Sequence, residues 1–158
     1  MSRAFIRKEV LPSTPAVSTR LGISGVGNTY TDVEIGKFVK VIGESAYGLC
    51  VAGDPIEGFI TSVEAATAQG FSIGGIQQED SKFATFDGLQ GTPGTGILAV
   101  GDYVVCGTVV ARGTGLAAPA RVGKATSQAV SFFNWRVVSL GVAGSGAVGT
   151  VGLIDLVG

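Results

Sequence analysis

Short runs of β-branched and aromatic residues, separated by glycine and aspartate, follow one another from residue 34 to the end of the chain. Most of these runs are too short for a typical helix, and their residue types favour strands. Runs spaced about ten residues apart with turn signals between them are typical of β-sandwiches and barrels. We expect strands at Phe38–Ile42, Leu49–Ala52, Phe59–Val63, Phe71–Ile76, Lys82–Phe86, Ile97–Val100, Tyr103–Ala111, Ala120–Ala125, Ala129–Val142 and Val148–Val157.

The fold class that this pattern predicts is all-β, as a jelly-roll-like β-sandwich or a small β-barrel. The 26 glycines among 158 residues suit tight turns, bulges and close approach of neighbouring backbones. A helix is conceivable only at Ser62–Gln69, where Ser62 could cap the first turn and Gly70 could end it. A strand followed by a loop suits the same residues equally well.

Residues 1–34 lack a sustained hydrophobic period and contain Pro12, Pro15 and a glycine-rich stretch, so they are interpreted as an extended N-terminal arm. Residues 35–158 then form a single β-sandwich domain, a length that can bury a core without disulfides or metal. The arm is basic, because residues 1–20 hold four basic side chains and one acidic one. Residues 41–102 hold eight acidic side chains and only Lys82 as a basic one.

The chain is unusually apolar for a soluble domain. Charged residues make up 15% of it, against roughly 25% in typical domains, and the mean hydropathy is +0.46. Large exposed apolar areas usually mark interaction sites, so we expect neighbouring subunits or a partner protein to cover part of this surface. Composition therefore favours a homo-oligomer.

Neither end of the chain predicts export or a membrane. The first ten residues carry four charges and no continuous apolar segment, unlike a secretory signal. The uncharged stretch Val137–Ile154 is long enough for a membrane helix, but its five glycines oppose one. Cys50 and Cys106 lie in apolar runs, so we interpret them as reduced core residues of a protein assembled inside a cell.

Catalysis and cofactor binding find little support in the sequence. The chain has no histidine, which removes the usual general base and the commonest metal ligand. The glycine pattern at Gly144–Gly149 lacks room for a βαβ unit, and Gly123-Lys124 lacks the other residues of a phosphate-binding loop. Asp54 with Glu57 could form an acid and base pair, but loop carboxylates are usually solvated surface charges. We expect no enzyme, no cofactor, no metal and, at a pI of 5.3, no nucleic acid.

A basic, proline-containing arm followed by a small β domain rich in Gly, Ala and Val resembles the decoration proteins, also called cement proteins, of tailed bacteriophage heads. The resemblance implies a structural virion protein, assembled in the host cytoplasm, that forms a homodimer or homotrimer on the outer surface of the capsid. Its partner would be the major capsid protein, and it would cement neighbouring subunits. The segments that carry the resemblance are Ser2–Thr19, Gly36–Val41, Ala52–Phe59, Gly101–Val104 and Trp135–Val138.

In this interpretation the arm becomes ordered on the capsid. Phe5 and Ile6 would be apolar anchors, and the basic side chains would meet acidic groups of the partner. Ordering costs about 1–2 kcal/mol of backbone entropy per residue, so the arm must make real contacts to be held. The predicted partner-binding residues are Arg3, Phe5, Ile6, Arg7 and Lys8.

Two other functions are compatible with the sequence. The first is a receptor-binding or carbohydrate-binding β module of a virion, in which Trp135 could be a stacking platform for a sugar, although a core aromatic is the commoner role. The second is a small enzyme of the trimeric dUTPase type, faintly similar at Ala52–Ile56 and Ala111–Gly115. That enzyme's central uridine-binding motif has no match in this chain.

Overall fold

In a computed structural model of the chain, the structure describes residues 17–22, 30–43, 46–64, 72–78, 81–126 and 135–156. These residues form strands and one 3-10 turn, which confirms the all-β prediction, and no helix among them is long and apolar enough to cross a membrane. The elements are β1 Val17–Leu21, η1 Asp32–Glu34, β2 Phe38–Gly43, β3 Ala46–Leu49, β4 Gly58–Glu64, β5 Ser72–Gln77, β6 Lys82–Leu89, β7 Thr92–Pro93, β8 Val104–Cys106, β9 Arg121–Lys124, β10 Trp135–Ser139 and β11 Val151–Leu156.

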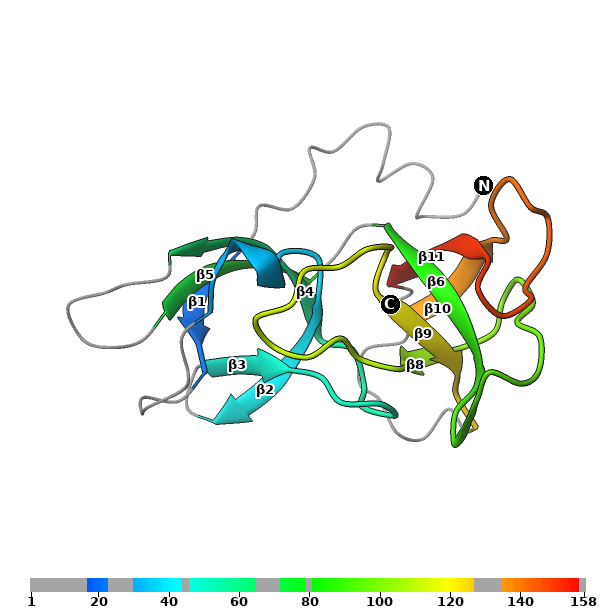
Figure 1. Ribbon diagram of the computed structural model, residues 1–158, viewed down its shortest axis with the longest axis horizontal. Coiled ribbons are helices and arrows are strands. Elements are labelled where there is room, and N and C mark those ends of the chain that lie inside the picture. The colour runs from blue at the N-terminus through cyan, green and yellow to red at the C-terminus, as the bar shows by residue number, and fades with distance from the viewer. Residues whose placement is uncertain are drawn as a thin grey trace.

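The first five strands form a closed barrel in the order β1-β3-β2-β4-β5, with β5 pairing back onto β1. Strands β1, β2, β4 and β5 each contribute one buried apolar side chain to the interior of this barrel. With Tyr30, these side chains form a small core of Leu21, Tyr30, Val39, Ile60 and Ile76. Figure 1 shows this first barrel at one end of the molecule's long axis.

The remaining strands form a second sheet in the order β10-β11-β6-β9-β8, beside the first barrel (Figure 1). The short strand β7 pairs only with β6. A single bridge between Tyr103, just before β8, and Arg136 of β10 joins the two edges of this sheet. The second sheet is therefore also rolled into a barrel, closed by fewer hydrogen bonds than the first.

The two barrels have the same topology. Strands β1 to β5 correspond in chain order to β6, β8, β9, β10 and β11, and each neighbouring pair in one barrel has its counterpart in the other. The pairs β1·β3 and β6·β9 are the parallel ones, and all other pairs are antiparallel. A jelly roll is built from antiparallel Greek keys, so a parallel pair in each sheet distinguishes this fold from one.

The correspondence extends to register and local irregularities. Leu21 pairs with Tyr47 in the first barrel as Phe86 pairs with Val122 in the second. A register shift follows Ile60 in β4, and another follows its counterpart Val137 in β10. The Gly36 N–H donates to the Ile60 carbonyl at 2.7 Å, and the Gly101 N–H donates to the Val137 carbonyl at 2.8 Å. The chain is thus a tandem repeat of one five-stranded barrel.

The repeat is visible in the sequence once the strands are aligned. The run Val33-Glu34-Ile35-Gly36-Lys37-Phe38-Val39 corresponds to Leu98-Ala99-Val100-Gly101-Asp102-Tyr103-Val104. Both runs place an aromatic and a valine after a glycine with positive φ, +89° at Gly36 and +93° at Gly101. A glycine is required there, because other residues adopt this backbone conformation only with strain.

The predicted boundary at residue 34 differs from the structure. Strand β1 lies within the predicted arm, pairs with β5 along its full length and also contacts β3, and η1 follows it at the rim of the first barrel. The polar residues of β1 concealed it, because Ser18, Thr19 and Arg20 lack an apolar pattern. Among the described residues, the folded part therefore begins at Val17.

Most predicted strands are present and several differ in extent, but the strand predicted at Ile97–Val100 is absent, because only Ile97 forms an isolated bridge there. Residues 50–52 leave β3 because Asp54 accepts a hydrogen bond from the Val51 N–H at 2.7 Å and turns the chain. Strand β8 ends at Cys106, because the Thr108 N–H turns toward Asp87 instead of continuing the ladder. Ser62–Glu64 of the possible helix belong to β4, and 65–69 lie outside the described residues.

One apolar core crosses from the first barrel into the second. Phe38, Cys50, Ile56 and Phe59 of the first barrel pack with Phe86, Trp135 and other buried residues of the second. The rings of Phe59 and Trp135 meet edge to face with centroids 6.4 Å apart. Because this core is shared, the barrels form one packed body.

Candidate functional site

The residues that the sequence predicts to bind a partner, Arg3, Phe5, Ile6, Arg7 and Lys8, lie outside the described residues. The other candidate, Trp135, is fully buried between the barrels and contacts Phe59. A buried indole cannot stack on a sugar, so the stacking-platform interpretation of Trp135 is wrong and its role is in the core.

The carboxylates considered for catalysis shape loops in the structure. Asp54 accepts a hydrogen bond from the Val51 N–H and forms an ion pair with Lys40 at 2.7 Å. Glu57 accepts a hydrogen bond from the Val41 N–H at 2.6 Å. Among the described residues, no group of three or more Asp, Glu or Cys side chains is arranged to hold a metal ion.

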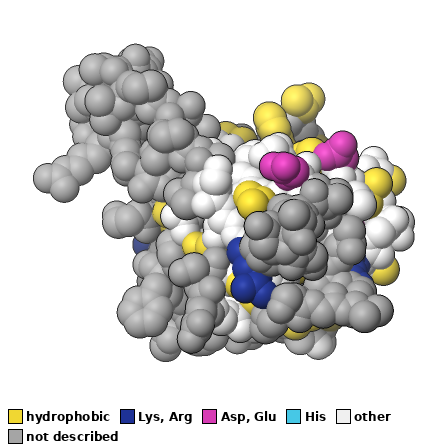
Figure 2. Space-filling view, turned by 90° about the vertical axis from the view of Figure 1, so that its left-hand side faces the viewer, with side chains coloured by type: hydrophobic (Ala, Val, Ile, Leu, Met, Phe, Trp, Pro, Cys, Tyr) yellow, Lys and Arg dark blue, Asp and Glu magenta, His cyan; other side chains and the backbone are white. Residues whose placement is uncertain are grey.

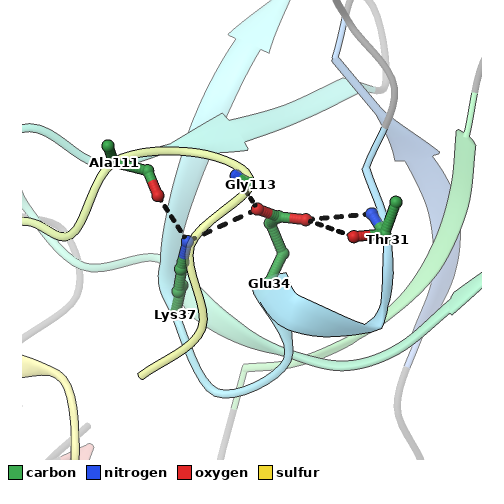
Figure 3. Close-up of polar contacts among 5 residues, drawn as sticks. All are labelled: Thr31, Glu34, Lys37, Ala111 and Gly113. Carbon is green, nitrogen blue, oxygen red and sulfur yellow. Dashed lines mark hydrogen bonds and ion pairs between the residues drawn. The ribbon is translucent and has the colours of Figure 1, made fainter. Parts of the chain in front are cut away.

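A buried carboxylate fastens the second barrel to the first. Glu34 of η1 is fully buried, and one of its oxygens accepts hydrogen bonds from the Thr31 N–H at 2.9 Å and from the Thr31 hydroxyl (Figure 3). The other oxygen accepts from the Gly113 N–H at 2.6 Å. Gly113 lies in the 107–120 loop between β8 and β9, so this bond joins the two repeats.

Lys37 completes this cluster, and its side chain is also nearly buried. Its ammonium lies 3.4 Å from Glu34 and donates to the Ala111 carbonyl at 3.0 Å. Burial by itself would raise the pKa of Glu34, but the two backbone N–H donors and the Lys37 ammonium outweigh it and hold that pKa below its usual value. Every contact of the cluster is internal, so its role is to hold the 107–120 loop against the first barrel.

A cavity of about 150 Å³ lies under this loop, at the junction of the barrels. Its lining is mostly apolar and includes both cysteines, each nearly fully buried. The hydrogen bond to Cys106 and burial both raise the pKa of the Cys50 thiol. A protonated, buried thiol is a poor nucleophile, so the pair behaves as packing residues.

The junction also opens to solvent as a shallow groove beside Phe83, which is largely exposed. Lys82 lines this groove with its ammonium 4.3 Å from the centre of the Phe59 ring. Burial lowers the pKa of Lys82, and no ion pair joins it to a described carboxylate. The cation is held by the aromatic face instead.

The far end of the second barrel exposes several large apolar side chains. Ile97 is 69% exposed, and its bridge to Ala147 places it beside the neighbouring Val148. Val142 is fully exposed and belongs to the same connection between β10 and β11 as Val148. We call Ile97, Val142 and Val148 the apolar end.

The opposite end of the molecule belongs to the first barrel. Figure 2 views it from the first-barrel side, where hydrophobic, acidic and basic side chains of the described residues are all visible. Single exposed apolar residues are ordinary on a protein surface, whereas several together mark a place of contact. The apolar end of the second barrel is therefore a candidate for binding another protein.

Comparison with known proteins found no match among protein families, curated proteins or solved structures.

Proposed function

We propose that this protein is a capsid decoration protein of a tailed bacteriophage, which binds the outer surface of the capsid and cements neighbouring major capsid protein subunits. The observation that carries the proposal is the apolar end. Ile97 and Val142 expose large apolar side chains to solvent, and exposed apolar patches commonly mark protein-binding sites. A cement needs surfaces that bind proteins and needs no reacting groups.

The tandem repeat supports the same function. Two barrels joined by a shared core form a rigid body, so binding at one end fixes the position of the other. A rigid body can bridge two capsid subunits without the entropic cost of ordering a linker. Many copies on a symmetric lattice then turn modest affinity at each site into strong reinforcement.

The N-terminal arm adds a second contact in this proposal. Phe5 and Ile6 supply apolar anchors, and Arg3, Arg7 and Lys8 supply positive charge for acidic groups of the capsid. The apolar end and the arm are then separate determinants, and each can be removed without the other.

Co-sedimentation with expanded, undecorated phage heads tests the proposal. The full chain should bind saturably, and a chain starting at Ala16 should bind about tenfold or more weakly, a loss of about 1.4 kcal/mol. Starting at Ala16 preserves β1, whereas starting at Glu34 would remove it and open the first barrel.

Two substitutions refine this experiment. Val142→Asp places a charge on the apolar end and should reduce binding to the heads, and Val109→Asp changes another exposed valine, on the 107–120 loop, and should bind as the unchanged chain does. Circular dichroism checks that both variants are folded. Absence of binding by the full chain would overturn the proposal and favour a receptor-binding module.

A further inference from the structure

The contact between the barrels uses a defined face of the first barrel, which we call the contact face. It consists of residues that the second barrel covers, and all of them are buried. Phe59 meets Trp135 and the Lys82 ammonium, and Gly36 lies against Leu116. The members of the contact face are Gly36, Lys37, Phe38, Cys50 and Phe59.

The second barrel has the same face, and the described part of the chain covers it only in part. The register of the repeat identifies its members, because Tyr103 pairs with Arg136 as Phe38 pairs with Phe59. None of them is buried, in contrast to every counterpart in the first barrel. Val100 beside it is 61% exposed. This open face consists of Gly101, Asp102, Tyr103, Ala125 and Arg136.

The complementary surface shows the same asymmetry. In the second barrel, the backbone of Cys106 forms two hydrogen bonds with the first barrel. Its N–H donates to the Asp54 carbonyl at 2.9 Å, and its carbonyl accepts from the Gly53 N–H at 2.8 Å. Cys106 is 5% exposed, whereas its counterpart Val41 in β2 is 50% exposed. Val41 and the neighbouring Ile42, also exposed, form what we call the open edge.

The two barrels are therefore joined head to tail. Trp135, Lys82 and Leu116 of the second barrel cover the contact face of the first. Cys106 bonds beside it, to the loop at Gly53 and Asp54. One open face and one open edge remain on each chain. A contact between two different surfaces of identical molecules repeats from copy to copy, and it closes into a ring when the rotation permits. In a ring of three or more copies, each copy binds one neighbour through its open face and another through its open edge.

We propose that the open face of the second barrel binds the open edge of the first barrel in another copy of this chain. The covered contact face is the template, since a barrel of the same topology already occupies the corresponding site within the chain. This proposal is independent of capsid binding, because it concerns the free protein.

The side chains of the open face suit a surface that is exposed until assembly. The aromatic pair Phe38 and Phe59 of the contact face is replaced by Tyr103 and Arg136, with the guanidinium 4.2 Å from the ring centre. Arg136 also donates a hydrogen bond to the Tyr103 hydroxyl. The polar groups of Tyr103 and Arg136 can be hydrated in the free chain. Val100, next to the open face, provides apolar area for contact with another copy.

Sedimentation velocity of the full chain across a range of concentrations tests the proposal. The unchanged chain should form an oligomer of three or more copies. Val100→Asp beside the open face and Val41→Asp on the open edge should each weaken association about tenfold or more. The matched control Val109→Asp should associate as the unchanged chain does.

Mixing the two variants gives the sharpest result. Val100→Asp leaves the open edge unchanged, and Val41→Asp leaves the open face unchanged. The open edge of the first variant should therefore bind the open face of the second, giving a dimer with one copy of each. Native mass spectrometry identifies that mixed dimer by mass. A monomeric unchanged chain, variants that associate normally, or a mixture that stays monomeric would each overturn the proposal, whatever the result with phage heads.

Discussion

Glu34 occupies a position where a carboxylate is costly, because its side chain is fully buried. The cost is offset by hydrogen bonds from Thr31 and Gly113 and by the Lys37 ammonium. Its counterpart in the second barrel is Ala99, which has no such role. The glutamate therefore belongs to the junction and not to the barrel fold itself.

Replacing Glu34 with Gln should lower the free energy of unfolding at neutral pH by about 1–3 kcal/mol, since a charged acceptor is lost and Lys37 stays buried. The folded state lowers the pKa of Glu34, so its contribution is present above the ordinary glutamate pKa and is lost as pH falls through the folded value. The difference between the two proteins should shrink in acid. Urea unfolding at several pH values measures it.

Asp32→Asn is the control for this measurement, because Asp32 lies in the same turn and is exposed. It should change stability by no more than about 0.5 kcal/mol. An unfolding difference for Glu34→Gln that stays constant down to low pH would contradict the assigned role.

The thiols give a second test at this scale. Cys50 and Cys106 are buried, and the pKa of Cys50 is raised by its contact with Cys106 and by burial. Both should be unreactive toward a disulfide reagent in the native protein and should react fully after denaturation. Spectrophotometric titration measures this, and rapid native reaction would show that the junction opens.

At the scale of elements, strand pairs and their bulges are repeated between the barrels, and so are positions where a strand passes close to a core side chain. A Cβ on Gly74 of β5 would lie 2.4 Å from Leu21 Cδ1, and one on Gly152 of β11 would lie 2.2 Å from Phe86 Cζ. Leu21 and Phe86 occupy equivalent places in the two registers. These glycines are conserved between the repeats for space.

Gly74→Ala and Gly152→Ala should therefore each lower the free energy of unfolding, by about 1–3 kcal/mol through overpacking. Gly115→Ala is the matched control, because a Cβ there meets nothing within 4 Å. Thermal or urea unfolding compares the three. Equal stability of all three variants would contradict the equivalence of the two sites.

At the scale of the molecule, the shared core decides how the protein unfolds. Phe59 of the first barrel and Trp135 of the second pack against each other in the shared core, so separating the barrels would expose part of that core to water. Two repeats joined in this way should behave as one cooperative unit.

We expect a single unfolding transition, with Trp135 fluorescence and far-UV circular dichroism giving the same midpoint. Phe59→Ala should shift both signals together, by about 3–5 kcal/mol in the free energy of unfolding. Separate transitions for the two signals would show that the barrels unfold independently.

The sequence by itself determined the fold class and most of the strands. Runs such as Phe59–Val63 and Lys82–Phe86 are strands because β-branched and aromatic side chains fit a pleated surface, a local property that a short window reveals. The apolar composition also predicts a surface that binds other proteins, and this stays a prediction. The predicted arm contacts at Arg3, Phe5, Ile6, Arg7 and Lys8 stay predictions.

Only the tertiary structure decided which strands pair, and with them the tandem repeat and the open face. Strand β1 pairs with β5, more than half a repeat away in sequence, and its polar residues gave no local signal. The side chains of the junction also diverge between repeats, since Phe59 is replaced by Arg136 and Glu34 by Ala99. The contact face of the first barrel is covered and favours apolar residues, whereas the open face of the second barrel is partly exposed and favours polar ones. Because equivalent positions therefore carry different residues, the repeat is hard to recognise from the sequence alone.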